Sequence, residues 1–147
     1  MTMLREKYMN KLISPPFEQS SAIMAIKYVE QLWNDGKLQD IGELFCVNCQ
    51  WRDNERHLHG KEQIMSFLKS KTTEQLHNKL TTELWNYSFY QLVVSFQSEW
   101  QNSKNGQWYR ISGHGFIGFG QAGLITEFRL SVSVRTIFSS DRVVHIN

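Results

Sequence analysis

The spacing of hydrophobic residues changes near the middle of the chain. Up to about residue 77, apolar residues recur three and four positions apart, which is the spacing of an amphipathic helix. Beyond that point they alternate with polar residues, as in strands that bury one face. The pattern therefore predicts helices first and a run of antiparallel strands afterwards, which is an α+β protein with its helices on one face of the sheet.

Three helices are expected in the first half. Ser20 or Ser21 is placed to cap the first, and Asn34-Asp35-Gly36 ends it. In the third, Ile64, Phe67, Leu68 and Lys71 recur at helical spacing. The helical spacing with its stop signals covers 17–36, runs from 38 to an end between 46 and 48, and covers 61–76, and a brief extended piece is expected at 50–53.

Four long strands are expected in the second half, at 80–89, 92–100, 107–119 and 124–134. An Asn-Gly pair at 105–106 indicates a hairpin turn between the second and third. Four glycines between 113 and 120 weaken regular pairing and permit strong bending. A sharply curved sheet that wraps around a helix leaves a hollow, and such a hollow is the default ligand site.

Size and charge restrict the function classes. The 147 residues suit a single domain at 15–140, with an N-terminal extension at 1–14, for which a short helix is possible, and a C-terminal tail at 141–147. The formal charge is only +2, without a long basic run, so a nucleic-acid partner is not expected. No apolar stretch reaches the ~20 residues of a membrane span, and no signal peptide is apparent. The expected location is cytoplasmic.

Several short motifs together resemble a known superfamily. They are PPF at 15–17, Trp51-Arg52, Gly60-Lys61-Glu62, ELW at 83–85, SFQSEW at 95–100 and GQWYR at 106–110. Over about 15–137 the chain resembles the NTF2-like (SnoaL-like, cystatin-like) superfamily, and within it the DUF1348 family of unknown function. The resemblance implies a curved antiparallel sheet and three N-terminal helices that form a cone-shaped pocket. It also implies a homodimer packed through the outer face of the sheet.

The resemblance does not assign a reaction. The superfamily includes ketosteroid isomerases, scytalone dehydratases, polyketide cyclases, limonene epoxide hydrolases and members that only bind proteins, and a shared fold does not choose among them. The chain also departs from the family pattern. Gly115 stands where the family has a carboxylate, and Val132-Ser133-Val134 stands where it has an Ile-Asn-Asp segment. If those groups carry the family chemistry, this member has changed or lost it.

Asp53 and His114 are the candidate catalytic residues. A carboxyl group held among rings has a raised pKa and can move a proton at neutral pH, and histidine suits proton transfer. Each residue also has a structural interpretation. Asp53 can cap the turn that follows it or pair with Arg52, and His114 can be a buried, hydrogen-bonded histidine. By alternation, His114 shares a face with Arg110, Ser112 and Phe116.

A ring-rich lining is expected for the pocket. The candidate ligand-binding residues are Trp51, Arg52, Trp85, Tyr87, Trp100, Trp108 and Arg110. The aromatic ones are equally explained as ordinary core. The alternating polar residues from Glu127 to Arg135 indicate a face in solvent or in a dimer contact.

Cys46 and Cys49, followed by His57 and His59, invite a zinc or redox interpretation. Their spacing does not match a standard finger, and a thioredoxin motif needs a βαβ setting that the pattern lacks. We therefore expect neither a metal nor a cofactor.

The leading hypothesis is a protein that binds a small, largely apolar ligand, and cofactor-independent isomerase, dehydratase or cyclase chemistry on that ligand is left open. The alternative is a non-catalytic binding or dimerisation module that has lost the pocket carboxylates of its family. A protein-interaction adaptor is a third possibility, since the fold can present an outer groove. The sequence leaves open whether the chain is an enzyme and which ligand it takes.

Overall fold

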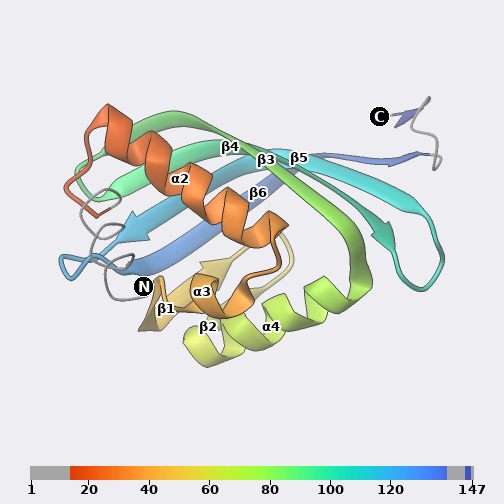
Figure 1. Ribbon diagram of the computed structural model, residues 1–147, viewed down its shortest axis with the longest axis horizontal. Coiled ribbons are helices and arrows are strands. Elements are labelled where there is room, and N and C mark those ends of the chain that lie inside the picture. The colour runs from red at the N-terminus through yellow and green to blue at the C-terminus, as the bar shows by residue number, and fades with distance from the viewer. Residues whose placement is uncertain (1–13, 139–144, 147) are drawn as a thin grey trace.

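A computed structural model describes residues 14–138 and 145–146 (Figure 1). The predicted N-terminal extension therefore lies almost wholly outside the described residues, as does most of the C-terminal tail. The elements in chain order are α2 (Gln19–Asn34), α3 (Leu38–Gly42), β1 (Phe45–Arg52), β2 (His57–His59), α4 (Lys61–Glu74), β3 (Gln75–Ser88), β4 (Gln91–Asn102), β5 (Trp108–Phe119), β6 (Ile125–Phe138) and β7 (His145–Ile146).

The strands form one curved sheet in the order β2-β1-β6-β5-β4-β3, and β7 pairs with β6. Every pairing is antiparallel except that of β1 with β6, which is parallel. The helices gather on one side, where α2 packs along β3 and α4 packs against β1 and β3 (Figure 1). The predicted α+β class, with a curved sheet and helices, is confirmed. The sheet was expected to be purely antiparallel, and the parallel pairing of β1 with β6 corrects that expectation.

The second helix and the strand after it differ from their predicted bounds. The helix was expected to end between 46 and 48, but α3 ends at Gly42 and β1 begins at Phe45. Two interactions favour the strand. Pairing with β6 supplies backbone hydrogen bonds, and next to the strand Ile125 N donates to Leu44 O at 2.7 Å. The strand also buries the side chains of Phe45 and Cys49. Sheet pairing thus overrides the local helical spacing.

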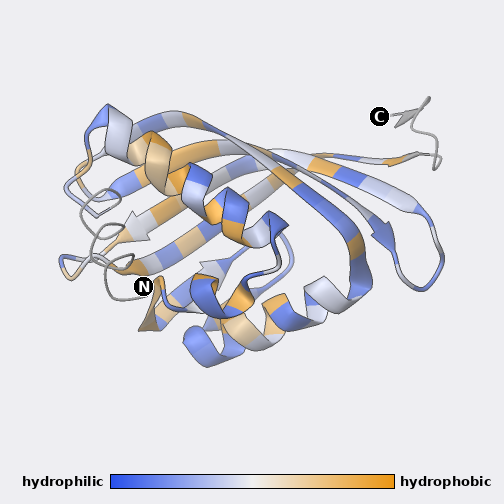
Figure 2. Cartoon of the chain, in the orientation of Figure 1, coloured by the Kyte–Doolittle hydropathy of each residue, from blue (hydrophilic) through white to orange (hydrophobic). Residues whose placement is uncertain are grey.

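The core lies between the helices and the concave face of the sheet. Figure 2 shows apolar positions alternating with polar ones along the strands and forming a stripe on α2. The most deeply buried large side chains come from an N-terminal segment, α4, β4 and β6, and they are Phe17, Ile64, Leu92 and Ile125. Burial of such side chains contributes roughly 1.5–3 kcal/mol each to stability. The core therefore holds the helices and the sheet together around the region described next.

A β-bulge in β6 changes which side chains face inward. Ser112 pairs with Val134 whereas Gly113 pairs with Val132, so Ser133 has no opposite residue. Gly113 allows this close approach, because a Cβ at that position would contact the Ser131 backbone oxygen. The bulge shifts the alternation by one residue, and Arg135 consequently faces the concave side.

Candidate functional site

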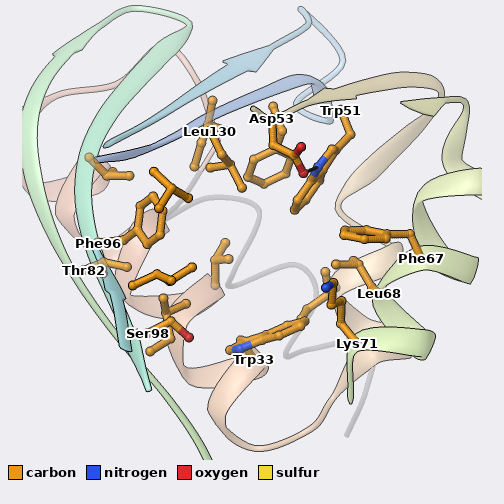
Figure 3. Close-up of a pocket in the computed structure, with 18 of the residues that line it drawn as sticks. Trp33, Trp51, Asp53, Phe67, Leu68, Lys71, Thr82, Phe96, Ser98 and Leu130 are labelled. Atoms are coloured by element: carbon orange, nitrogen blue, oxygen red, sulfur yellow. Dashed lines mark hydrogen bonds between the residues drawn. The ribbon is translucent and has the colours of Figure 1, made fainter. Parts of the chain in front are cut away.

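A cavity of about 400 Å³ lies between the helices and the concave face of the sheet (Figure 3). Its walls come from α2, α3, α4, β1, β3, β4, β5 and β6. The large aromatic and aliphatic side chains of this wall include Ile26, Trp33, Phe45, Trp51, Phe67, Phe96, Trp100, Phe128 and Leu130. A volume of this size and an apolar lining are typical of small-molecule sites.

Asp53 directs the turn between β1 and β2 at the cavity wall. Its Oδ1 accepts the backbone N–H groups of Glu55 at 2.8 Å and of Arg56 at 3.0 Å. Its Oδ2 accepts the indole Nε1–H of Trp51 at 3.1 Å and the Arg56 Nη1 at 2.8 Å. Both carboxylate oxygens therefore accept two hydrogen bonds each, which occupies the acceptor capacity of the group.

The electrostatic setting of Asp53 favours the charged form. Burial alone would raise the pKa of this carboxyl, but the hydrogen bonds from Glu55 and Trp51 and the charge of Arg56 hold the pKa below its usual range. The raised pKa considered from the sequence is thus contradicted, because the neighbouring rings bring a hydrogen-bond donor and the turn brings a cation. Asp53 caps its turn, and its ion-pair partner is Arg56 rather than Arg52.

Two neighbours fix this turn against the rest of the site. The side-chain amide of Asn54 donates to Val132 O at 3.3 Å and accepts Val132 N at 3.2 Å. Val132 lies beside the bulge in β6, so these hydrogen bonds connect the turn to the sheet. The Arg56 guanidinium lies 4.4 Å from the centre of the Phe67 ring on α4. The turn is therefore connected to both walls of the cavity.

The charged part of the lining contains more cations than carboxylates. Arg56, Lys71 and Arg135 line the cavity together with Asp53 and Glu55. Figure 3 shows the Lys71 side chain directed into the cavity beside Trp33 and Leu68. Its ammonium lies 5.5 Å from the Phe67 ring centre and 3.8 Å from Glu74.

A polar cluster of side chains adjoins the cavity wall across from Asp53. The Trp33 indole donates to Asn78 Oδ1 at 3.0 Å, and Asn78 in turn donates to Gln75 at 2.6 Å. Thr82 donates its hydroxyl to Glu30 at 2.6 Å. The hydrogen bonds among these polar groups hold this part of the wall together.

The predicted ligand-binding residues fall into two groups. Trp51 and Trp100 line the cavity, as the sequence suggested. The other five do not line it, for reasons that differ by residue. Trp108 is buried against the His77 ring at 6.0 Å, Arg110 pairs with Glu99 at 2.8 Å, and Arg52, Trp85 and Tyr87 are exposed.

His114 lies on the opposite face of the sheet from Asp53. Its ring is exposed and contacts the Trp85 ring at a centroid distance of 4.3 Å. The inward positions of β5 include those of Ile111 and Ile117, which line the cavity. His114 and Ser112 share a face of the sheet, as the alternation predicted, and both border a separate hollow. That face is the outer one. The structure therefore does not bring His114 and Asp53 together, and a buried His114 is also contradicted.

Gly115 occupies an inward position of β5. A Cβ there would lie 3.0 Å from Leu130 Cδ2 and 3.2 Å from Val94 Cγ2, both of which belong to cavity residues. A carboxylate at this position would press against these two residues of the cavity wall. With glycine, the central part of the sheet wall is apolar instead. Val134 faces outward and is 43% exposed.

The two cysteines and the two histidines do not form one site. Cys49 is fully buried, whereas His57 and His59 are exposed on β2 with their rings 4.1 Å apart. Among residues 14–138 and 145–146, no group of three or more His, Cys, Asp or Glu side chains is arranged to hold a metal ion.

In the part of the chain that the structure describes, none of the helices combines the length and the apolar character that a membrane span requires.

Sequence reasoning did not select several residues of the site. Phe67 and Lys71 were assigned only to a helical stripe, although their spacing of four placed them on one helix face. Arg56 carried a local signal, since it stands three residues after a turn-capping Asp. Arg135 had none, because the bulge that turns it inward depends on a contact between strands.

A curved sheet with helices packed over its concave side and an apolar cavity between them is the NTF2-like α+β fold. The family model described as a protein of unknown function, DUF1348, matches residues 15–145, and the chain belongs to this family. No curated protein matches the sequence.

Solved structures share the fold at low identity. An NTF2-like protein of unknown function from Exiguobacterium sp. 255-15 is 12% identical, with a TM-score of 0.66 over 74% of this chain and 97% of its own. The epoxide hydrolase/cyclase-like enzyme SalBIII, described in pyran ring formation in the polyether salinomycin, is 14% identical, with a TM-score of 0.66 over 88% and 93%. A computationally designed 17-OHP binder is 14% identical, with a TM-score of 0.69 over 86% and 99%.

Proposed function

We propose that this protein binds a small, largely apolar molecule in the cavity between α2, α4 and the sheet. The observation that carries the proposal is the cavity of about 400 Å³, with Trp33, Trp51 and Phe67 in its wall. Aromatic side chains provide large apolar contact surfaces to a ligand. The designed 17-OHP binder of the same fold supports a binding role, because it is named for a small molecule.

Binding without acid–base chemistry is the form of the proposal that the site supports best. Asp53 uses its oxygens for the turn, for Trp51 and for Arg56. A general base needs a free lone pair within reach of the substrate proton. Gly115 leaves the sheet wall without a carboxylate at that position. These features favour the non-catalytic alternative over an isomerase, dehydratase or cyclase.

A second candidate function is cofactor-independent catalysis with Asp53 as the base. The observation in its favour is that the Asp53 side chain lines the cavity, is only 13% exposed and is ionised at neutral pH. A substrate that displaced the Arg56 side chain would free one acceptor position on Oδ2, which would still accept the Trp51 indole N–H. The resemblance in fold to SalBIII, an epoxide hydrolase/cyclase-like enzyme, supports keeping this candidate.

The test is direct binding of a neutral apolar fluorophore, phenylnaphthylamine, with native mass spectrometry for co-purifying molecules. Leu130→Trp should place a larger ring in the cavity and weaken binding of the fluorophore about tenfold. Ser131→Trp is the control, because it adds the same ring at the next position, which is exposed. Equal binding by both variants and the wild type would reject the cavity as the site.

Catalysis is tested separately with the molecule that co-purifies. Turnover by the wild type that Asp53→Asn abolishes, with binding retained, would favour the second candidate over the first. Binding without turnover in both proteins would leave the binding role as the function.

We also propose that the protein is a homodimer joined through the outer face of the sheet. Trp85 and Val134 expose 62% and 43% of their surfaces there. The Arg129 guanidinium lies 4.8 Å from the Phe116 ring, which adds a partly apolar patch on the same sheet. Contiguous exposed apolar patches are typical of interaction surfaces, and these residues are the ones that would contribute to such a patch here.

A further inference from the structure

We propose that the ligand of the cavity carries an anionic group, such as a carboxylate, and that the Lys71 ammonium binds it. The inference rests on the proposed binding function and adds the chemical class of the ligand. Lys71 would then recognise the ligand. Helix periodicity alone would explain this lysine by packing and by its favourable position in the last turn of the helix.

The position of Lys71 is the first argument. Lys71 lies in the last turn of α4, on the same helix face as Phe67 and Leu68, and all three line the cavity. Its side chain is 32% exposed and is directed into the cavity (Figure 3). A cation that stands among rings has fewer water molecules around it than a surface lysine. A ligand anion that reaches it therefore meets a stronger attraction than it would in solvent.

The pairing of the charges is the second argument. Of the three cations in the lining, Arg56 contacts Asp53 at 2.8 Å and Glu55 at 3.6 Å, and both carboxylates belong to the lining. Arg135 contacts Glu55 at 3.7 Å. Lys71 contacts Glu74 at 3.8 Å, and Glu74 is not part of the lining. The lining thus holds one more positive than negative side chain, and Lys71 is the cation whose carboxylate partner stands outside it.

The chemistry of the lysine fits an anion on an apolar body. A lysine ammonium has three N–H donors on a flexible stem, so it can follow a carboxylate without a fixed fork geometry. The rings of Trp33 and Phe67 on either side of the ammonium would hold the apolar part of the same molecule. The site therefore favours an amphiphilic organic anion over a neutral hydrocarbon of the same shape.

The experiment is displacement of bound phenylnaphthylamine by two competitors of matched shape, naphthoate and naphthalenemethanol. The wild type should respond to naphthoate at a concentration roughly tenfold lower than to the alcohol, since charge-assisted hydrogen bonds at half-exposed sites are worth about that factor. Lys71→Gln should remove this preference while phenylnaphthylamine still binds. Lys71→Arg should keep it, because the charge remains.

Lys69→Gln is the matched control, since Lys69 lies on the same helix but is exposed outside the lining. It should keep the preference for naphthoate. Equal displacement by the two competitors in the wild type, or a preference that survives Lys71→Gln, would overturn the inference alone. Failure of phenylnaphthylamine to bind the wild type would overturn the proposed function, and the inference with it.

Discussion

The Asp53 carboxylate and the Arg56 guanidinium form an ion pair at 2.8 Å within the turn that borders the cavity. Trp51 donates to the same carboxylate oxygen, so one anion connects the end of β1, the turn and the cavity wall. The same turn also contacts α4 through Arg56 and β6 through Asn54. The geometry of the site therefore depends on the charge of Asp53.

Asp53→Asn should destabilise the protein by about 1–3 kcal/mol at pH 7, because an amide replaces an anion that accepts four hydrogen bonds. The pKa of Asp53 is lowered in the folded state relative to 3.8, so its stabilisation is present above that pH. It is lost as the pH falls through the folded pKa. Urea denaturation of both proteins from pH 7 to pH 3 measures this difference.

The gap between wild type and Asp53→Asn should accordingly shrink at the acid end, and other titrating groups cancel in the comparison. A gap that stays constant down to pH 3, or widens there, would contradict the assigned ionisation of Asp53.

Gly113→Ala should destabilise the protein by more than about 2 kcal/mol, because the new methyl group would clash with the Ser131 backbone. Strands β5 and β6 cannot move apart at this point without losing the bulge. Gly115→Ala is the matched comparison. Its methyl group would meet only the side chains of Leu130 at 3.0 Å and Val94 at 3.2 Å, which can rotate away. Thermal unfolding should rank the two variants in that order, and equal losses would contradict the close approach at Gly113.

Trp85→Ser should shift the proposed homodimer toward monomer, because it removes a ring that is 62% exposed on the outer sheet face. Phe89→Ser is the control, since Phe89 is 70% exposed but lies at the turn between β3 and β4. Light scattering coupled to size-exclusion chromatography measures both. A wild type that is monomeric at all concentrations would reject the dimer, and a similar shift by both variants would reject this face as its interface.

The change of hydrophobic period at residue 77 was enough to predict the class of fold. It identified α2, α4 and the long strands, because each of these elements buries one face against a single core. The boundary between α3 and β1 was wrong. Phe45 belongs to a strand because its partner Ile125 lies eighty residues later, and no local pattern contains that information.

Alternation showed which residues share a face but not which face is the inner one. Arg110, Ser112 and His114 were grouped together, and they lie on the outer side. Trp51 and Trp100 were chosen as rings on extended segments and both are buried, whereas Trp85 carries the same signal and is exposed. The inward turn of Arg135 follows from the bulge opposite Gly113, which is a property of two strands together.

The buried thiol of Cys49 gives the last prediction. Burial raises the pKa of this thiol to about 12, with smaller contributions from Cys46 and Glu127. At pH 8 only about one Cys49 in ten thousand would then be a thiolate, which is the reactive form. Iodoacetamide should therefore modify the partly exposed Cys46 far faster than Cys49 in the native protein, as peptide mapping would show. In denaturant the two rates should become similar, so the denatured sample is the control. Equal native rates would contradict the burial of Cys49 and reopen a redox role for the pair.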